Sequence, residues 1–269
     1  MSSSPPHSEA APFDALAPSY DADFTRSPIA RALRDRIQQR LLALAPAGAA
    51  VLELGCGTGE DAHFLATHQR VVTATDVSPA MREIASARLA GFAGARVLPL
   101  DLNALGNTPL SGNYQLAFSN FGVFNCVHDL PLTARWLAGQ VNAGGTVALC
   151  IMAPRCLWEM AWHGAHGNLG TAFRRWRTSI VFHTDTGDIA IRYPSVARVT
   201  RAFAPYFRRA RVLPVGFFLP PSDMYPVLER RPRLLSRLMR LDNATRDWPA
   251  LANFSDHYWI ELTRTDTPA

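Results

Sequence analysis

Three glycines lie where they could bring the backbone close to a small ligand. Residues 51–61 read as a short apolar strand, a loop containing Gly55, Gly57 and Gly59, and the start of a helix. Glycine has no Cβ, so such a loop can take positive φ and approach a ligand closely. A dinucleotide-binding fingerprint would need a further glycine where Glu60 stands, and an acidic side chain there would repel a pyrophosphate.

Two carboxylates flank this loop in the expected sheet. Glu53 lies near the end of the first strand, and a second strand over residues 71–75 runs into Asp76. The carboxyl ends of adjacent parallel strands form the crevice where open α/β sheets bind ligands. A carboxylate at the end of the second strand can accept hydrogen bonds from both hydroxyls of a ribose.

The pattern Glu53-x-Gly55-x-Gly57-x-Gly59, followed by Asp76-Val77-Ser78-Pro79-Ala80-Met81, resembles the class I S-adenosylmethionine (SAM) dependent methyltransferases. The resemblance implies that the glycine loop, with Glu53 and Cys56, carries the methionine part of SAM, and that Asp76 and Val77 bind near the ribose. It also implies a doubly wound α/β fold, with a mostly parallel seven-stranded sheet and an antiparallel last strand. A structural glycine turn would explain the first motif alone, but not both motifs at this spacing.

The same resemblance assigns further positions in the SAM site. Met81 would pack on the adenine, with a buried core methionine as the alternative. Asp101 would accept a hydrogen bond from the adenine amine while the backbone of Leu102 reads the ring, although Asp101 could instead cap a helix. Asn120 and Phe121, after the fourth strand, would line the pocket of SAM and substrate.

The segment 13–21, with the pattern F-D-x-x-A-x-x-Y-D, resembles the N-terminal segment of the ubiquinone-type and malonyl-carrier-protein methyltransferases. There the segment closes over SAM with its tyrosine, here Tyr20, near the ligand. The alternative is an aromatic staple that packs the first helix. We expect residues 1–12 to be disordered and residues 13–269 to form one methyltransferase domain.

Composition bounds the class of protein. The 269 residues, 48% hydrophobic and 18% charged, fit one globular domain. No apolar run is long enough to span a membrane and residues 1–12 hold no hydrophobic signal region, so we expect a cytoplasmic protein. The 4 cysteines show no C-x-x-C pair, and we expect no disulfide framework and no metal site. All 27 basic residues are arginine, which excludes a Schiff-base lysine and a P-loop.

The hydrophobic pattern extends the fold along the chain. We expect helices at 27–44, 78–89, 195–205 and 222–241, strands at 96–100, 114–119, 144–152, 207–218 and 258–263, and a turn at 142–145.

The acceptor site is expected in the part of the chain after the fifth strand. Residues 153–194 would form a lid over the crevice, made of an aromatic, arginine-rich helical part and a β-hairpin over residues 179–193. Candidate substrate residues are Asn125, Trp158, Trp162 and Arg174. The alternative is an amphipathic packing helix with a solvated arginine face.

No catalytic residue is assigned. His128, His163 and His166 are weak candidates for a general base, as is His183, and each could equally be structural or exposed. Asn125, Cys126 and His128 are expected to begin the helix after the fourth strand, and the family often has a histidine where Cys126 stands.

The predicted function is SAM-dependent methyl transfer to a small-molecule acceptor, at oxygen, nitrogen or carbon. Aromatic rings and arginines in the lid would suit an aromatic or acidic acceptor or a carrier-bound acyl group. One alternative is an RNA methyltransferase, which the net charge of +5 and the lack of an N-P-P-Y type motif disfavour. Another is a SAM-binding protein without turnover. The sequence leaves the oligomeric state open.

Overall fold

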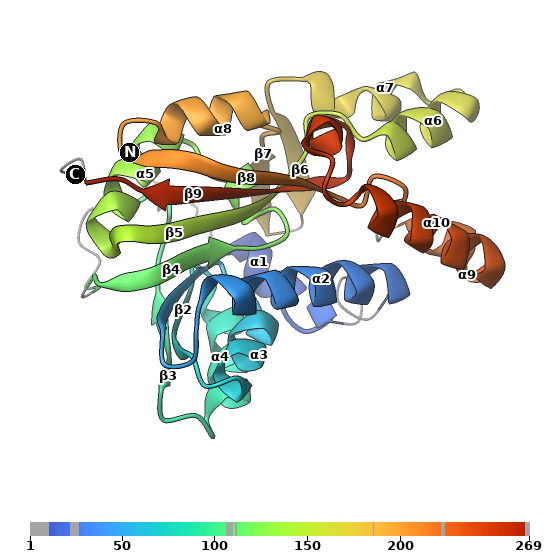
Figure 1. Cartoon of the computed structure of the whole chain (residues 1–269). Helices are drawn as coiled ribbons and strands as arrows, with labels where there is room; N and C mark the ends of the chain where they lie inside the picture. Colours follow the sequence, from blue (N-terminus) through green and yellow to red (C-terminus); the bar gives the residue numbers. More distant parts are fainter. Residues whose placement is uncertain are drawn as a thin grey trace, which may run out of the picture.

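The computed structural model describes residues 11–21, 27–105, 110, 112–184, 186–221 and 224–266. Seven strands form one sheet in the order β3-β2-β1-β4-β5-β9-β8, with helices on both faces (Figure 1). The strands are β1 (Ala50–Leu54), β2 (Val71–Asp76), β3 (Ala95–Pro99), β4 (Tyr114–Ser119), β5 (Val141–Met152), β8 (Phe207–Val215) and β9 (His257–Arg264).

The first five strands of the sheet are parallel, and β9 is antiparallel to both β5 and β8. This confirms the predicted doubly wound α/β sheet and its antiparallel last strand. The direction of β9 has a consequence for the site. Its first residue, His257, pairs with Met152 at the end of β5, so the start of β9 lies at the same edge as the carboxyl ends of the parallel strands.

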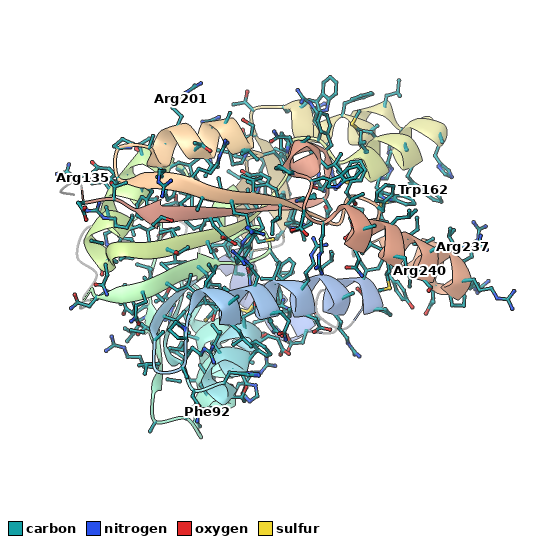
Figure 2. The ribbon with its side chains drawn as sticks, in the orientation of Figure 1. Phe92, Arg135, Trp162, Arg201, Arg237 and Arg240 are labelled. Atoms are coloured by element: carbon teal, nitrogen blue, oxygen red, sulfur yellow. The ribbon has the colours of Figure 1, made fainter. Side chains whose placement is uncertain are left out.

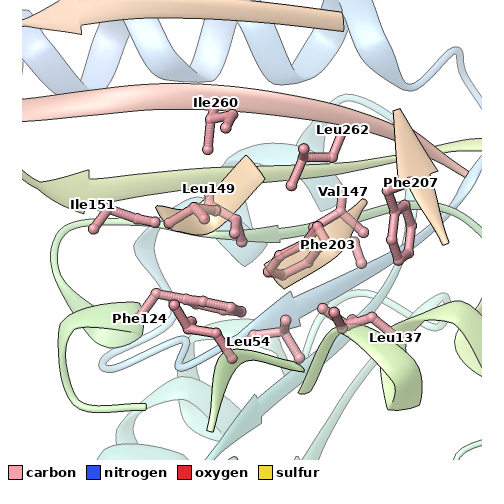
Figure 3. Close-up of a cluster of buried hydrophobic side chains, with 14 of the residues drawn as sticks. Leu54, Phe124, Leu137, Val147, Leu149, Ile151, Phe203, Phe207, Ile260 and Leu262 are labelled. Carbon is pink, nitrogen blue, oxygen red and sulfur yellow. The ribbon is translucent and has the colours of Figure 1, made fainter. Parts of the chain in front are cut away.

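The sheet separates two apolar cores because side chains alternate between its faces. Leu149 and Ile151 of β5 pack in one core with α5 (Leu130–Gln140) and α8 (Val196–Phe203), which Figure 3 shows around Phe203. Cys150, between them, packs in the other core. That second core includes residues of α2 (Pro28–Leu44), α3 (Glu60–Thr67), α4 (Pro79–Leu89), α9 (Pro226–Glu229) and α10 (Pro232–Thr245).

Side chains cap the helices as the sequence predicts. Ser27 accepts a hydrogen bond from the backbone N–H of Ala30 at 3.1 Å and starts α2. Ser78 accepts one from Met81 at 3.1 Å and starts α4 directly after the crevice. Each cap satisfies one backbone donor that the first helical turn leaves unpaired.

The predicted lid, residues 153–194, contains two short helices, α6 (Leu157–Ala165) and α7 (Leu169–Ala172), and a separate hairpin of β6 (Ile180–Thr184) and β7 (Gly187–Ile191). The hairpin was predicted correctly. Helix α1 (Ala11–Leu16) contacts both β7 and α4, so the N-terminal segment connects the hairpin to the nucleotide side of the sheet.

Two local predictions differ from the structure. The predicted turn 142–145 lies inside β5, where the register with β4 shifts between Tyr114 and Leu116 because the extra residues bulge out of the ladder. Asn125 ends a single 3₁₀ turn, Val123–Asn125, and Cys126 and His128 lie in the loop after it. The following helix starts only at Leu130, where Asp129 supplies the cap.

Helix α1 starts at Ala11, inside the range 1–12 expected to be disordered; residues 1–10 lie outside the described part of the chain. Within the described ranges, no helix combines the length and the apolar character needed to cross a bilayer.

Candidate active site

A cavity of about 420 Å³ lies at the carboxyl edge of the sheet. One end is lined by the glycine loop, Asp76 and the residues that follow β3. The other end is lined by the hairpin, the lid helices and the start of β9. The predicted SAM crevice and part of the predicted lid therefore enclose a single space.

Asp76 lies in this cavity with its carboxylate already oriented. Its Oδ2 accepts a hydrogen bond from Gly57 N–H at 2.8 Å, and its Oδ1 accepts one from Ser78 N–H at 2.9 Å. Burial raises the pKa of the Asp76 carboxyl, and the two N–H donors oppose that shift. Each carboxylate oxygen keeps acceptor capacity, which suits a pair of ribose hydroxyls.

The three glycines of the loop serve different ends. A Cβ on Gly59 would lie 2.9 Å from the Ala85 Cβ, and a Cβ on Gly55 would lie 2.5 Å from the Val123 side chain. These two glycines allow close packing of the loop. A Cβ on Gly57 would lie 3.8 Å from Tyr20 and otherwise project into open space, and its φ of +52° disfavours a side chain. Gly57 therefore keeps the cavity clear.

Glu53 and Asn120, predicted to bind SAM, are buried and lie outside the described lining of the cavity, near the carboxylate of Asp61. Asp61 accepts hydrogen bonds from Arg34 at 2.6 Å, Gln38 at 2.8 Å and Asn120 at 2.8 Å. Oε2 of Glu53 and Oδ1 of Asn120 have no hydrogen-bond partner among the described residues. Burial and the nearby charge of Asp61 hold the pKa of Glu53 well above its usual value.

The adenine end follows the sequence assignment in position. Val77, Met81, Asp101 and Leu102 all line the cavity. Asp101 also accepts a hydrogen bond from Asn103 N–H at 2.8 Å, so it shapes its own turn and leaves its second oxygen for a ligand. Met81 lines the cavity although it is only 2% exposed, so one side chain serves both roles considered for it, packing in the core and facing the ligand space.

The N-terminal segment 13–21 closes one side of the cavity, and Tyr20 lines it. Asp14 accepts hydrogen bonds from the Ser78 hydroxyl and from Ala80 N–H at the start of α4. Asp21 accepts one from the Thr58 hydroxyl at 2.7 Å and pairs with Arg88 at 2.6 Å. Both aspartates of the motif thus tie the segment to the elements that carry the glycine loop and the ribose site.

The lid end is built around a buried ion-pair network. Glu159 of α6 pairs with Arg174 and Arg175 at 2.6 Å each, and Arg175 also pairs with Asp256 at 2.8 Å. The pKa of Glu159 is lowered because the two arginines outweigh the effect of its burial. Arg174 lines the cavity as predicted, but its charge is already balanced by Glu159.

The other predicted substrate residues lie outside the described lining of the cavity. Asn125 is fully buried; its amide donates to the carbonyls of Met152 and Arg192 and accepts from Met152 N–H, so it braces β5 against the chain that leaves the hairpin. Trp162 stacks on His166 with ring centroids 4.3 Å apart, and Figure 2 places it at the lid helices. Trp158 is likewise absent from the described lining.

Apolar residues that the sequence did not single out occupy the acceptor end instead. Phe182, Ile189 and Ile191 of the hairpin line it, together with Met152 and Pro221. Alternation along β6 and β7 could have indicated which hairpin residues face inward, because the predicted hairpin fixes the pairing.

The predicted histidines do not reach the described lining either. His128, His166 and His183 are exposed, and His163 is half-buried on the lid. His257, which the sequence reading overlooked, lines the cavity and hydrogen-bonds Asp256 at 3.0 Å. Asp256 and His257 are neighbours at the start of the last strand, and this pairing of a carboxylate with an imidazole could have identified His257 from the sequence.

One group of side chains has metal-ligand chemistry. Cys156, Glu159 and Asp256 are buried with one ligand atom each within 4.8 Å of one another. Arg175 donates to both carboxylates, and burial raises the pKa of the Cys156 thiol to about 12. A cation would have to displace a buried guanidinium and deprotonate this thiol, so the arrangement favours an ion-pair network over a metal centre.

The residues at the nucleotide end of the cavity could hold SAM. The space above Gly57 would leave room for a methionine part, Asp76 could accept hydrogen bonds from ribose hydroxyls, and Met81 and Val77 could pack against an adenine.

Comparisons with known proteins agree with this fit. A family model described as a methyltransferase domain matches residues 26–183. The chain is 30% identical over 164 residues to the malonyl-[acyl-carrier protein] O-methyltransferase of Halorhodospira halophila, which covers 60% of this chain and 53% of that protein. It is 34% identical over 138 residues to the protein of the same name from Pectobacterium atrosepticum, covering 49% and 52%. The chain thus spans about half the length of these curated relatives.

Solved structures share the fold over nearly the whole chain. The CcbJ methyltransferase from Streptomyces caelestis aligns with a TM-score of 0.63 and 15% identity over 96% of this chain and 99% of that one. The complex of DhpI with SAH aligns with a TM-score of 0.61 and 18% identity over 96% of each chain. Because the family model matches more than half of the chain, this chain belongs to the methyltransferase-domain family, and it shares its fold with these solved structures.

Proposed function

We propose that the protein methylates a small-molecule acceptor, which it holds between the crevice and the hairpin. The observation that supports this proposal is the single cavity that runs from Asp76 to Phe182 and His257. A donor held at Asp76 and an acceptor held under the hairpin would share that space.

SAM supplies an electrophilic methyl group on a sulfonium. The chain's own residues would bind and orient the two reactants and exclude water. Asp76 fixes the ribose, Gly57 leaves room for the methionine part, and Phe121 lies at the boundary between the two ends of the cavity. Orientation and desolvation of this kind can supply up to about 7 to 11 kcal/mol of the barrier reduction.

We assign acceptor selection to residues 153–194 as a lid. Phe182, Ile189 and Ile191 present an apolar wall, while the guanidinium of Arg174 lies at the same end with Glu159 as its partner. An aromatic or apolar acceptor with a polar substituent suits this combination. A carrier-bound acyl group is the second acceptor class, because the curated relatives are named for a malonyl group on a carrier protein.

The RNA alternative would need nucleic acid to reach the methyl group. Arg237 and Arg240 project from α10 at the surface (Figure 2), and neither belongs to the described lining of the cavity. These arginines do not by themselves connect a phosphate backbone to the reaction site.

The test combines calorimetry of SAM with assays of S-adenosylhomocysteine release. The acceptors are 2-naphthol, 2-naphthylmethylamine, 2-naphthoate, a malonyl thioester of an acyl carrier protein, and total RNA. We expect SAM binding together with turnover of a small or carrier-bound acceptor. If only RNA is methylated, and this activity is lost as the salt concentration rises, the protein would be a nucleic-acid methyltransferase instead. SAM binding without turnover on any acceptor would indicate a binding protein.

A further inference from the structure

Among the described residues, His257 is the histidine that lines the cavity. It is the first residue of β9 and pairs with Met152 of β5 on one side and with Val215 of β8 on the other. Its ring meets the Phe121 ring edge-on, with centroids 5.7 Å apart at 80°. Met152 and Phe121 line the cavity with it, so His257 stands at the junction of the SAM crevice and the acceptor end.

A carboxylate orients this imidazole. Nδ1 of His257 lies 3.0 Å from Oδ2 of Asp256, and the other carboxylate oxygen of Asp256 accepts a hydrogen bond from Arg175 at 2.8 Å. Burial alone would raise the pKa of Asp256, but His257 and Arg175 together hold it below its usual range. Asp256 therefore stays ionised, and its Oδ2 can accept the Nδ1 proton of the imidazole.

When the imidazole is neutral and its proton is on Nδ1, the lone pair is on Nε2. The described residues provide Nε2 with no hydrogen-bond partner, and the side chain is 13% exposed in a residue that lines the cavity. We propose that His257 is the general base of the reaction, with Asp256 as its positioning residue, and that the acceptor is one whose nucleophilic atom carries a removable proton. The inference deepens the proposed function and rests on it.

Atoms and charges balance in the step. The proton of the acceptor O–H, N–H or acidic C–H passes to Nε2, and the imidazolium that forms is balanced by Asp256. The electron pair left on the acceptor atom bonds to the methyl carbon, and the broken carbon–sulfur bond leaves its pair on sulfur, which becomes a neutral thioether. The proton then leaves His257 for water. General-base catalysis of this kind typically contributes on the order of 100- to 10,000-fold.

A general base at His257 would help some classes of acceptor and not others. An ionised carboxylate brings its own lone pair and has no proton to lose, so a base beside it does nothing for the reaction. An alcohol, phenol, ammonium or carbon acid does need one. The dyad therefore favours proton-bearing acceptors over carboxylates.

The charged groups packed around the dyad are few. Arg175 and Glu159 face it from the lid, and Arg34 of α2 stacks on Phe121 with its guanidinium 4.7 Å from the ring centroid. Arg175 lies between the carboxylates of Glu159 and Asp256, and the carboxylate in direct contact with His257 is that of Asp256.

The first test uses three probes with one skeleton, 2-naphthol, 2-naphthylmethylamine and 2-naphthoate, and the variant His257→Gln. We expect the wild type to methylate the first two and not the carboxylate. His257→Gln should lower kcat on 2-naphthol on the order of 100-fold or more while the Kd for SAM stays within about threefold. The fall of the wild-type rate at acid pH should vanish in the variant, whose residual rate should rise with pH as the phenol ionises by itself.

The exposed pair His183 and Asp188, joined at 2.8 Å on the hairpin, provides a matched control. His183→Gln removes the same chemistry away from the described cavity lining and should leave all rates unchanged. A wild type that methylates 2-naphthoate as readily as 2-naphthol, or a His257→Gln variant with unaltered kcat, would overturn the base while leaving methyl transfer intact. Absence of turnover on every probe, despite SAM binding, would overturn the proposed function and this inference with it.

A second test needs no acceptor. Diethyl pyrocarbonate should carbethoxylate His257 at Nε2 in the folded enzyme, and peptide mass spectrometry can compare its rate with that of exposed His183. Asp256→Asn, which lets the ring turn, should change the rate at His257 and not at His183. An unreactive His257 between pH 6 and 8 would show that Nε2 does not face the cavity.

Discussion

At the scale of single residues, Asp76 should carry much of the affinity for SAM. Charge-assisted hydrogen bonds to two ribose hydroxyls are worth about 1.5 to 3 kcal/mol. Asp76→Ala should therefore weaken SAM binding at least tenfold in calorimetry, with an unchanged circular dichroism spectrum. Asp188→Ala, on the exposed hairpin, is the control, and equal affinity in both variants would remove Asp76 from the site.

The same carboxylate predicts a pH dependence. Burial raises the pKa of Asp76 above the ordinary 3.8, and only the ionised form offers full acceptor strength to the hydroxyls. As pH falls through that raised pKa, SAM affinity should fall, and it should begin to fall at a higher pH than for an exposed aspartate. In Asp76→Asn this acid dependence should be lost, which calorimetry at several pH values can check.

Glu53 should lower the stability of the ligand-free protein at high pH. In the folded state its pKa is raised well above 4.5. At a pH between 4.5 and the raised pKa, the folded state therefore binds more protons than the unfolded state. Stability then decreases as pH rises through this window. Glu53→Gln cannot ionise, so its melting temperature should gain on the wild type as pH rises from 5 to 9. A difference that is constant across this range would contradict the assignment.

The sequence predicted many of the residues that line the nucleotide end of the cavity, but Arg174 alone among the four predicted substrate residues lies in the described lining. Gly57, Asp76 and Val77 are fixed by a strand, a turn and a helix start that follow one another directly, so local spacing determines where they lie. Trp162 was chosen for its size, but only tertiary packing decides which way a lid helix faces. His257 reaches the site through pairing with Met152, more than a hundred residues earlier, and no local pattern encodes that contact.

At the scale of elements, the N-terminal segment 13–21 should control the release of SAM. Asp21 ties it to Thr58 and Arg88, next to the glycine loop. Asp21→Ala should increase the dissociation rate of SAM several-fold in stopped-flow fluorescence, because the segment then opens more easily. Thr58→Val should act in the same direction, and the double variant should add less than the sum. Asp35→Ala, on the exposed side of α2, should have no effect.

The hairpin should determine acceptor affinity without affecting SAM. Phe182 is 53% exposed and lines the cavity, while its neighbour Val181, 50% exposed, lies on the other side of β6. Phe182→Ala should raise the KM for 2-naphthol several-fold, since roughly half of the 1.5 to 3 kcal/mol of a buried phenylalanine is at stake. Val181→Ala should change nothing. If both variants weaken SAM binding instead, the hairpin would be part of the nucleotide site.

At the scale of the whole molecule, the sheet was predictable and its details were not. Helix starts at Ser27 and Ser78 and the strand Tyr114–Ser119 appear where the sequence places them, because caps and apolar runs are local signals. The bulge in β5 was missed because Gly144 and Gly145 read equally as a turn or as an irregular strand. Such a choice is made by the neighbouring strand, here β4, and not by the residues themselves.

The position of β9 between β5 and β8 also bears on how the enzyme comes into being. A chain emerging from the ribosome can pair β1 to β5 as they appear, and β8 must then wait, since its neighbour in the sheet is made after it. Until β9 is made and pairs with β5, the cavity wall lacks His257. The nascent protein would therefore be able to recognise the nucleotide before it can perform chemistry, and it would gain catalytic competence only once β9 has been made.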